Sequence, residues 1–176
     1  MNDPFATLGI EPSFTIDLAA VEQRHRDLSR ALHPDKFAGA PAAERRLSLN
    51  RAIEVNEAWR AVRDPIKRAE ALMRRAGVPV GEIQEPKPSP ALLMEMMESR
   101  EALAEAAQKK DLAAVKGLGE EMEGRMNATL LALGKGFDEA GADRAKLAAL
   151  LPKMGELRYI RRFLDEVSAF EEEMLV

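Results

Sequence analysis

The chain contains no cysteine among its 176 residues. No disulfide can therefore form, no thiolate can hold a metal ion, and no cysteine can act as a nucleophile. Histidine is almost as scarce, with two residues, and neither lies in a carboxylate cluster with the spacing of metal ligands. A glycine-rich phosphate-binding loop is missing as well. The sequence therefore predicts a protein without a metal site or a resident cofactor, and it does not indicate an enzyme.

Aromatic residues make up only 5% of the chain, and the alanine, leucine and methionine content favours helices over sheets. No apolar run approaches the length of a membrane span, and the first residues lack the pattern of a signal peptide. The net charge of −4 argues against nucleic acid as a general partner. Together these features predict an all-α cytoplasmic protein that binds neither nucleic acid nor a membrane.

The most informative stretch, DLAAVEQRHRDLSRALHPDKF, covers residues 17–37. Arg26 and Arg30 lie on one side of an amphipathic helix predicted over 17–32, with Arg24 at the flank. Pro34 ends this helix near Leu32, because proline lacks a backbone N–H and restricts the residue before it. A basic helix that leads into a fixed polar loop indicates a docking element for an acidic partner. The apolar stripe expected on its other side comprises Leu18, Val21, His25, Leu28 and Leu32.

Three further helical segments are predicted in the first half of the chain. Residues 3–9 form a short turn capped by Asp3, residues 42–63 a long helix that contains the only tryptophan, and residues 66–76 a short helix closed by Gly77. The long helix should pack antiparallel to the basic helix. That packing places His33, Pro34 and Asp35, which we call the HPD loop, at the open end of a helical hairpin.

The second half is predicted to be a separate three-helix bundle. Residues 77–90 hold four of the ten prolines, which makes this segment the best linker candidate. The predicted organisation is an N-terminal domain over 1–76, a proline-rich linker over 77–88 and a bundle over 89–176. Helices are expected at about 90–109, 111–135 and 142–174, with Gly134, Gly136 and Gly141 marking the second break.

The first helix of the bundle has more apolar residues than one buried face needs. Its core stripe is predicted to be Leu92, Met96, Ser99, Leu103 and Ala106. A second set lies well round the helix, and methionine-rich surfaces with a charged rim suit adaptable binding. Part of this surplus can equally be core, because a bundle helix touches two neighbours. The second set comprises Leu93, Met94, Met97 and Ala104, with Glu98, Arg100 and Glu101 at its rim.

Three stretches give the chain a family resemblance. HPDK after a basic amphipathic helix resembles the signature of the J-domain co-chaperones. HPDKF together with NEAWRAVRDPIKRAEALM (56–73) and SPALLMEMMESREAL (89–103) resembles the HscB type, which serves iron–sulfur cluster assembly. The resemblance covers nearly the whole chain. It implies an L-shaped molecule that stimulates a dedicated DnaK/HscA-type ATPase and delivers the scaffold protein IscU to it.

The resemblance also implies roles for individual residues. Leu32 and Ala31 stand where J-domains usually have tyrosine and lysine, which argues against exchange with general-purpose chaperones. Tyr159 matches a phenylalanine position that the HscB family uses for the scaffold, whereas Phe163 and Phe170 are expected to pack inside the protein. The implied chaperone-binding residues are His33, Pro34, Asp35, Lys36, Arg26 and Arg30, and the implied scaffold-binding residues are Leu93, Met94, Met97, Glu98, Arg100, Glu101 and Tyr159.

Two other functions remain open on the sequence alone. The first is a helical adaptor whose hairpin stimulates no ATPase. The second is a J-protein that serves general misfolded clients instead of one scaffold.

Overall fold

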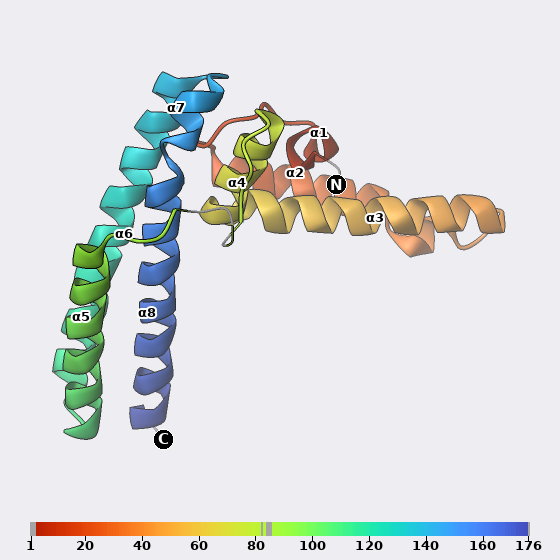
Figure 1. Ribbon diagram of the computed structural model, residues 1–176. Helices are drawn as coiled ribbons and strands as arrows, with labels where there is room; N and C mark the ends of the chain where they lie inside the picture. The colour runs from red at the N-terminus through yellow and green to blue at the C-terminus, as the bar shows by residue number, and fades with distance from the viewer. Residues whose placement is uncertain (1–2, 82, 84–85, 176) are drawn as a thin grey trace. The chain divides into compact units, whose positions relative to one another are not determined.

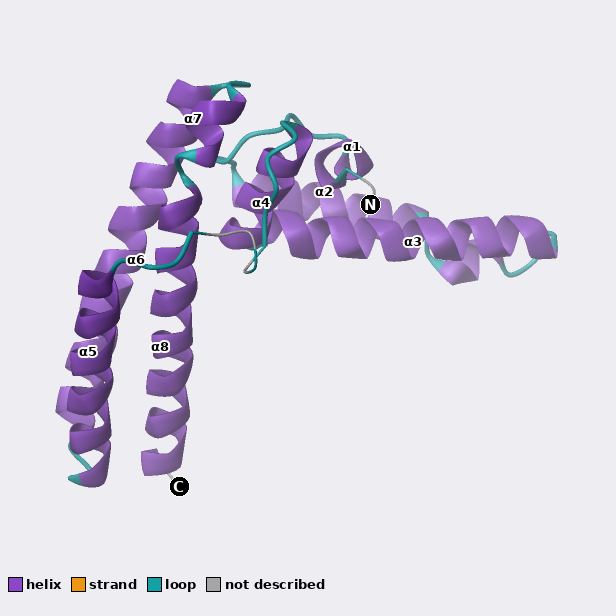
Figure 2. Ribbon diagram, viewed as in Figure 1, coloured by secondary structure: helices purple, strands orange, loops and turns teal. Residues whose placement is uncertain are grey.

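The computed structural model describes residues 3–81, 83 and 86–175 and divides the chain into two compact units, one ending at Val78 and the other beginning at Pro79. All regular structure in these described residues is helical, which confirms the predicted all-α class (Figure 2). None of their helices combines the length and apolarity needed to cross a membrane. The elements are α1 (Pro4–Leu8), α2 (Leu18–Ala31), a 3-10 helix η1 (Pro34–Phe37), α3 (Ala42–Arg63), α4 (Pro65–Arg75), α5 (Pro90–Gln108), α6 (Leu112–Ala140), α7 (Arg144–Ala148) and α8 (Leu151–Leu175) (Figure 1).

Capping residues set the ends of the helices in the first unit. The Asp17 carboxylate accepts a hydrogen bond from the Ala20 N–H, so α2 begins where the sequence predicts. Asp64 caps α4 in the same way, with Pro65 in the first turn. Gly9 and Gly77 follow α1 and α4 with φ of 64° and 72°, a left-handed conformation that glycine adopts at little cost. The predicted boundaries of these helices agree with the structure to within one residue at each end.

The core of the first unit lies between α1, α2, α3 and α4. The sequence predicts Leu18 in the apolar stripe of α2, but Leu18 is 47% exposed, and Val21 is the residue of this helix that is buried. Leu18 is the first residue of α2, at the end of the helix and not within it. The buried cluster comprises Phe5, Leu8, Val21, Val55, Ala58, Val62 and Ala71, and Leu28, Leu32 and Trp59 pack against it.

The second unit is built on α5, α6 and α8, which lie side by side in Figure 1, with α7 at one end. Phe163 is completely buried and Phe170 packs against the same core, as predicted. Thr129, Leu133 and Phe137 are buried along the inner face of α6, as expected of a bundle helix with one buried face. The core that joins the three long helices comprises Met96, Leu103, Ala106, Val115, Met122, Ile160, Phe163 and Val167.

The predicted break after residue 135 is wrong. Helix α6 continues to Ala140, and Gly134 and Gly136 lie inside it. A Cβ atom on Gly136 would lie 2.6 Å from Leu150 Cδ2, so this glycine allows close packing of the chain that precedes α8. The break occurs at Gly141, whose φ is 52°.

The single helix predicted over 142–174 is also wrong, because two helices occupy this range. The short α7 is capped by Asp143, whose carboxylate accepts hydrogen bonds from the N–H groups of Ala145 and Lys146. Pro152 lies in the first turn of α8 and has no N–H to continue a helix from α7. A proline signal at residue 152 therefore sets the start of the last helix.

Candidate functional site

The HPD loop is exposed at the point where α2 gives way to η1. The side chains of His33 and Asp35 are 59% and 88% exposed. His33 Nδ1 accepts a hydrogen bond from the Asp35 N–H at 3.3 Å and lies 3.4 Å from the Asp35 carboxylate. Pro34 occupies the first turn of η1 and fixes the backbone there. The loop thus presents an imidazole and a carboxylate outward on a short, constrained segment.

Contacts between α2 and α3 hold the loop in place. The hydroxyl of buried Ser48 donates to the Leu32 carbonyl at 3.1 Å, immediately before the loop. Further along the hairpin, His25 Nε2 lies 2.9 Å from the Asn56 side-chain oxygen, and its ring stacks on Trp59 with centroids 5.3 Å apart. His25 therefore packs between the helices, as the sequence predicts. These contacts rigidify the base from which the HPD loop projects.

The three arginines of α2 are exposed but differ in their partners. Arg24 donates from Nε to the Leu8 carbonyl at 3.2 Å and so ties α2 to the end of α1. Arg26 pairs with Glu22 at 2.8 Å, and Arg30 lies 3.7 Å from Asp27. Pairs of this kind within an exposed helix contribute only about 0.3–0.5 kcal/mol. Arg26 and Arg30 can therefore exchange these partners for an external carboxylate at small cost.

The second group of predicted residues lies on α5 and α8, and we call it the α5–α8 surface. Met94 and Met97 are 63% and 61% exposed, and Leu93 is 39% exposed. Met96, between them, is 3% exposed and belongs to the core, as predicted. The surplus apolar residues of α5 thus face outward, away from the bundle core. The α5–α8 surface comprises Leu93, Met94, Met97, Glu98, Arg100 and Glu101 of α5 and Tyr159 of α8.

An ion pair fixes the register between α5 and α8. Arg100 Nε donates to both carboxylate oxygens of Glu166, at 3.1 and 3.2 Å, across 66 positions of sequence. The two helices run in the same direction (Figure 1), so the same offset places Tyr159 level with Leu93. Tyr159 is half-buried, and its ring packs against the bundle core. Residues 93 and 159, far apart in sequence, therefore lie at the same level of two neighbouring helices.

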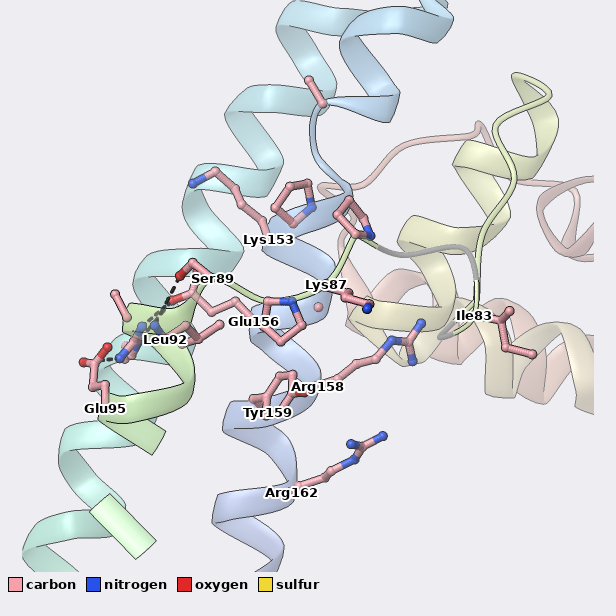
Figure 3. A pocket seen from close by; sticks show the side chains of 17 residues that line it. Ile83, Lys87, Ser89, Leu92, Glu95, Lys153, Glu156, Arg158, Tyr159 and Arg162 are labelled. Atoms are coloured by element: carbon pink, nitrogen blue, oxygen red, sulfur yellow. Dashed lines mark hydrogen bonds and ion pairs between the residues drawn. The ribbon is translucent and has the colours of Figure 1, made fainter. Parts of the chain in front are cut away.

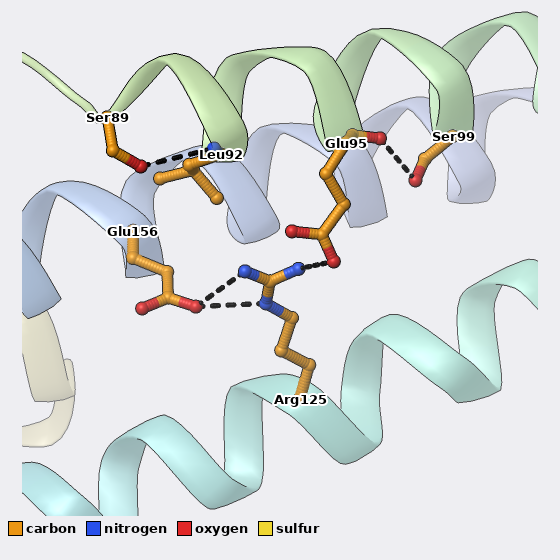
Figure 4. A network of polar contacts seen from close by, with 6 residues as sticks. All are labelled: Ser89, Leu92, Glu95, Ser99, Arg125 and Glu156. Carbon is orange, nitrogen blue, oxygen red and sulfur yellow. Dashed lines mark hydrogen bonds and ion pairs between the residues drawn. The ribbon is translucent and has the colours of Figure 1, made fainter.

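A charged network that joins the three long helices is absent from the sequence-based predictions. Arg125 of α6 donates from Nε to Glu156 at 2.9 Å and also pairs with Glu95, so one guanidinium links all three long helices (Figure 4). Desolvation lowers the pKa of Arg125, but the hydrogen bonds and charges of Glu156 and Glu95 outweigh it and raise this pKa overall. No pattern within one helix reveals this network, because its partners are separated by about thirty positions.

Four exposed or half-buried cations, from the linker and α8, form a second feature that the sequence does not predict. Lys87, Lys153, Arg158 and Arg162 line a cavity that also includes Tyr159 (Figure 3). In contrast, the described residues contain no group of three or more histidine, aspartate or glutamate side chains that could hold a metal ion. The described residues thus present three distinct features: the HPD loop with its arginines, the α5–α8 surface and this cation-lined cavity.

Comparison with known proteins places the chain in a family. A family model described as the HSCB C-terminal oligomerisation domain matches residues 88–168. The chain is 35% identical over 170 residues to the co-chaperone protein HscB homolog of Burkholderia multivorans, which covers 97% of this chain and 94% of that relative. The chain belongs to the HscB co-chaperone family. The HscB homolog of Bordetella avium is also 35% identical, over 97% of this chain and 98% of that protein.

Solved structures of HscB proteins share the fold. Chaperone HscB from Vibrio cholerae superposes with a TM-score of 0.85 at 24% identity, covering 98% of this chain and 99% of that one. The human co-chaperone protein HscB gives a TM-score of 0.83 at 24% identity, over 96% of this chain and 82% of the human chain. HscB co-chaperones are not enzymes.

Proposed function

We propose that this HscB co-chaperone stimulates the ATPase of a dedicated DnaK/HscA-type chaperone in the cytoplasm and delivers the scaffold protein IscU to it. The HPD loop, Lys36 and the arginines Arg26 and Arg30 bind the chaperone, and the α5–α8 surface binds the scaffold. The cluster carried by IscU is cargo and needs no ligand from this chain.

The observation that carries the proposal is the outward presentation of the HPD loop on a braced hairpin. The Asp35 carboxylate, 88% exposed, is available to pair with an arginine of the chaperone. The loop supplies no group for phosphate chemistry. It acts by binding one conformation of the chaperone more tightly than another, which shifts that equilibrium toward ATP hydrolysis. The preorganised backbone at Pro34 reduces the entropy lost on docking.

The two binding surfaces lie in different units of the chain, which supports client delivery as the function of the α5–α8 surface. The HPD loop belongs to the first unit and the α5–α8 surface to the second, so one chain can hold a chaperone and a client together. Tethering in this way raises the effective concentration of the client at the chaperone.

A single-turnover ATPase assay with the DnaK/HscA-type chaperone of the same cell tests the proposal. The wild-type protein should accelerate hydrolysis, and Asp35→Asn should abolish that acceleration without loss of helicity, because Asp35 is outside the core. Asp138→Asn removes one exposed carboxylate from α6 in the second unit and should stimulate like wild type. Absence of stimulation by the wild type would support the adaptor alternative, and stimulation without any affinity for IscU would support a J-protein for general clients.

A further inference from the structure

Methionine thioethers are the only sulfur in the chain, because it has nine methionines and no cysteine. Among the methionine side chains that the structure describes, Met94 and Met97 are 63% and 61% exposed. Within this set, the exposed sulfur therefore lies on the α5–α8 surface. The other methionines of the set are buried or packed against a core, and they are Met73, Met96, Met122, Met126 and Met154.

Helix α5 separates its three methionines by accessibility. Met94 and Met97 are three residues apart, so they lie on the same side of the helix, next to the partly exposed Leu93. Met96 directly precedes Met97 in the sequence, but it is 3% exposed and belongs to the bundle core. Methionine is oxidised according to its exposure, so the first two should react with a dissolved oxidant long before Met96.

We propose that Met94 and Met97 form a reversible oxidation site, at which hydrogen peroxide switches off client binding. This inference rests on the proposed function, because both side chains belong to the surface assigned to IscU. The thioether sulfur attacks one peroxide oxygen, so that an S–O bond forms and the O–O bond breaks. The proton on the transferred oxygen passes to the departing hydroxide, which leaves as water. Sulfur loses two electrons, peroxide gains them, and the product is methionine sulfoxide.

Oxidation changes the part of the α5–α8 surface that is most apolar. A sulfoxide is polar, whereas the thioether is a flexible apolar group that adapts to a partner. Water solvates the sulfoxide oxygen in the free protein, and a client that covers it must remove that water. Burial of one such group without a hydrogen bond weakens binding by about five- to hundredfold. The fold should persist, because both side chains lie outside the core.

The same exposure makes the change reversible. Methionine sulfoxide reductases return the sulfoxide to the thioether at the expense of two thiols, which form a disulfide while the oxygen leaves as water. Such an enzyme can reach Met94 and Met97 without unfolding α5. The HPD loop contains no methionine, and Met73 in the first unit is completely buried. Oxidation of the site should therefore stop client delivery and leave stimulation of the chaperone intact.

Peroxide treatment of the full-length protein, followed by removal of the peroxide before IscU is added, tests the inference. Peptide mass spectrometry should show one added oxygen on Met94 and on Met97 before Met96 gains any. The Kd for IscU in calorimetry should rise by about fivefold or more, and methionine sulfoxide reductases with dithiothreitol should restore it. ATPase stimulation without IscU should stay at the untreated level, and circular dichroism should show unchanged helicity.

Two variants identify the residues responsible. Leucine has a volume close to that of methionine and cannot form a sulfoxide, so in the double variant Met94→Leu and Met97→Leu peroxide should not change the Kd from its untreated value. Met97→Gln places a polar oxygen on a side chain of similar length and should weaken binding without any peroxide.

The outcomes separate this inference from the proposed function. An equal rise in Kd in the double leucine variant would overturn the inference, because the effect would then come from another residue, Met1 and Met174 included. An unchanged Kd in the oxidised wild type, or oxidation of Met96 as fast as that of Met97, would overturn it while IscU remained the client. If the untreated wild type does not bind IscU, the proposed client is wrong and this inference falls with it.

Discussion

Replacing Met97 by alanine should weaken the complex with IscU by an amount that follows from its exposure. Full burial of a methionine side chain stabilises by about 1.5–3 kcal/mol. Met97 is 61% exposed in the free protein, so this fraction of its surface remains to be covered by a client. The expected loss is about 1–2 kcal/mol, which corresponds to about five- to thirtyfold in Kd.

Leu131 supplies a matched control for this measurement. It is an exposed apolar side chain of similar size on α6, 70% exposed, outside the α5–α8 surface. Leu131→Ala should leave IscU affinity unchanged in the same calorimetric titration, and neither variant should lose helicity, because neither side chain is buried. Equal weakening by both variants, or no weakening by Met97→Ala, would refute the assignment of the α5–α8 surface to the client.

Three further predictions concern stability and charge. Both Gly124→Ala and Gly136→Ala gain about 1 kcal/mol of helix propensity. A methyl group on Gly124 would meet open space, whereas one on Gly136 would meet Leu150, so Gly136→Ala also costs about 1–3 kcal/mol through overpacking. Gly124→Ala should thus be the more stable of the two in urea unfolding followed by circular dichroism, and equal stabilities would contradict the close packing of α6. Asp64→Ala removes the cap of α4 and should lower the free energy of unfolding by about 1 kcal/mol. Asp64→Asn should retain most of the stability that the cap contributes. An alanine variant as stable as wild type would argue against the cap. The hydrogen bond from Lys109 lowers the pKa of the Glu105 carboxyl. This pair therefore favours the folded state above the ordinary carboxyl pKa and loses that contribution as the pH falls through the lowered pKa. A carboxyl titration by NMR should give a lower midpoint in the wild type than in Lys109→Met, and identical midpoints would contradict the pair.

The helices of the first unit could be predicted closely because their signals are local. Asp17 and Asp64 are caps that act on the N–H groups two or three residues later. Gly9 and Gly77 end their helices through their own backbone conformation. Signals of this kind depend on a few neighbouring residues and are visible in the sequence without knowledge of the fold.

The glycines of α6 show where such signals fail. Gly136 and Gly141 look alike in sequence, yet one lies inside a helix and the other ends it. The difference comes from Leu150, which packs against Gly136 from a later part of the chain. The need for a glycine at position 136 thus depends on a contact across the fold. The break before α8 has a local signal at Pro152, which the periodic apolar pattern on either side obscures.

Some parts of the candidate site could also be predicted from the sequence, and others could not. The outward position of Met94 and Met97 follows from the helical spacing of α5 and the identity of its core stripe, and it could be predicted. The Arg125 network forms where three helices meet, and the spacing of its residues along the chain does not predict it. The same holds for the cation-lined cavity, because Lys87 lies in the linker and Arg162 in the last helix. Surfaces on one helix can be predicted from periodicity, whereas those assembled from several segments require the fold.

The central claim is that two separate surfaces drive the chaperone and hold the client, and ATPase stimulation measured with and without IscU tests it most directly. Asp35→Asn should lose stimulation under both conditions and keep wild-type affinity for IscU. Met97→Ala should keep wild-type stimulation without IscU, and more IscU should be needed to reach the full rate with it. If either variant loses both chaperone stimulation and IscU binding while remaining folded, the two functions are not carried by separate surfaces.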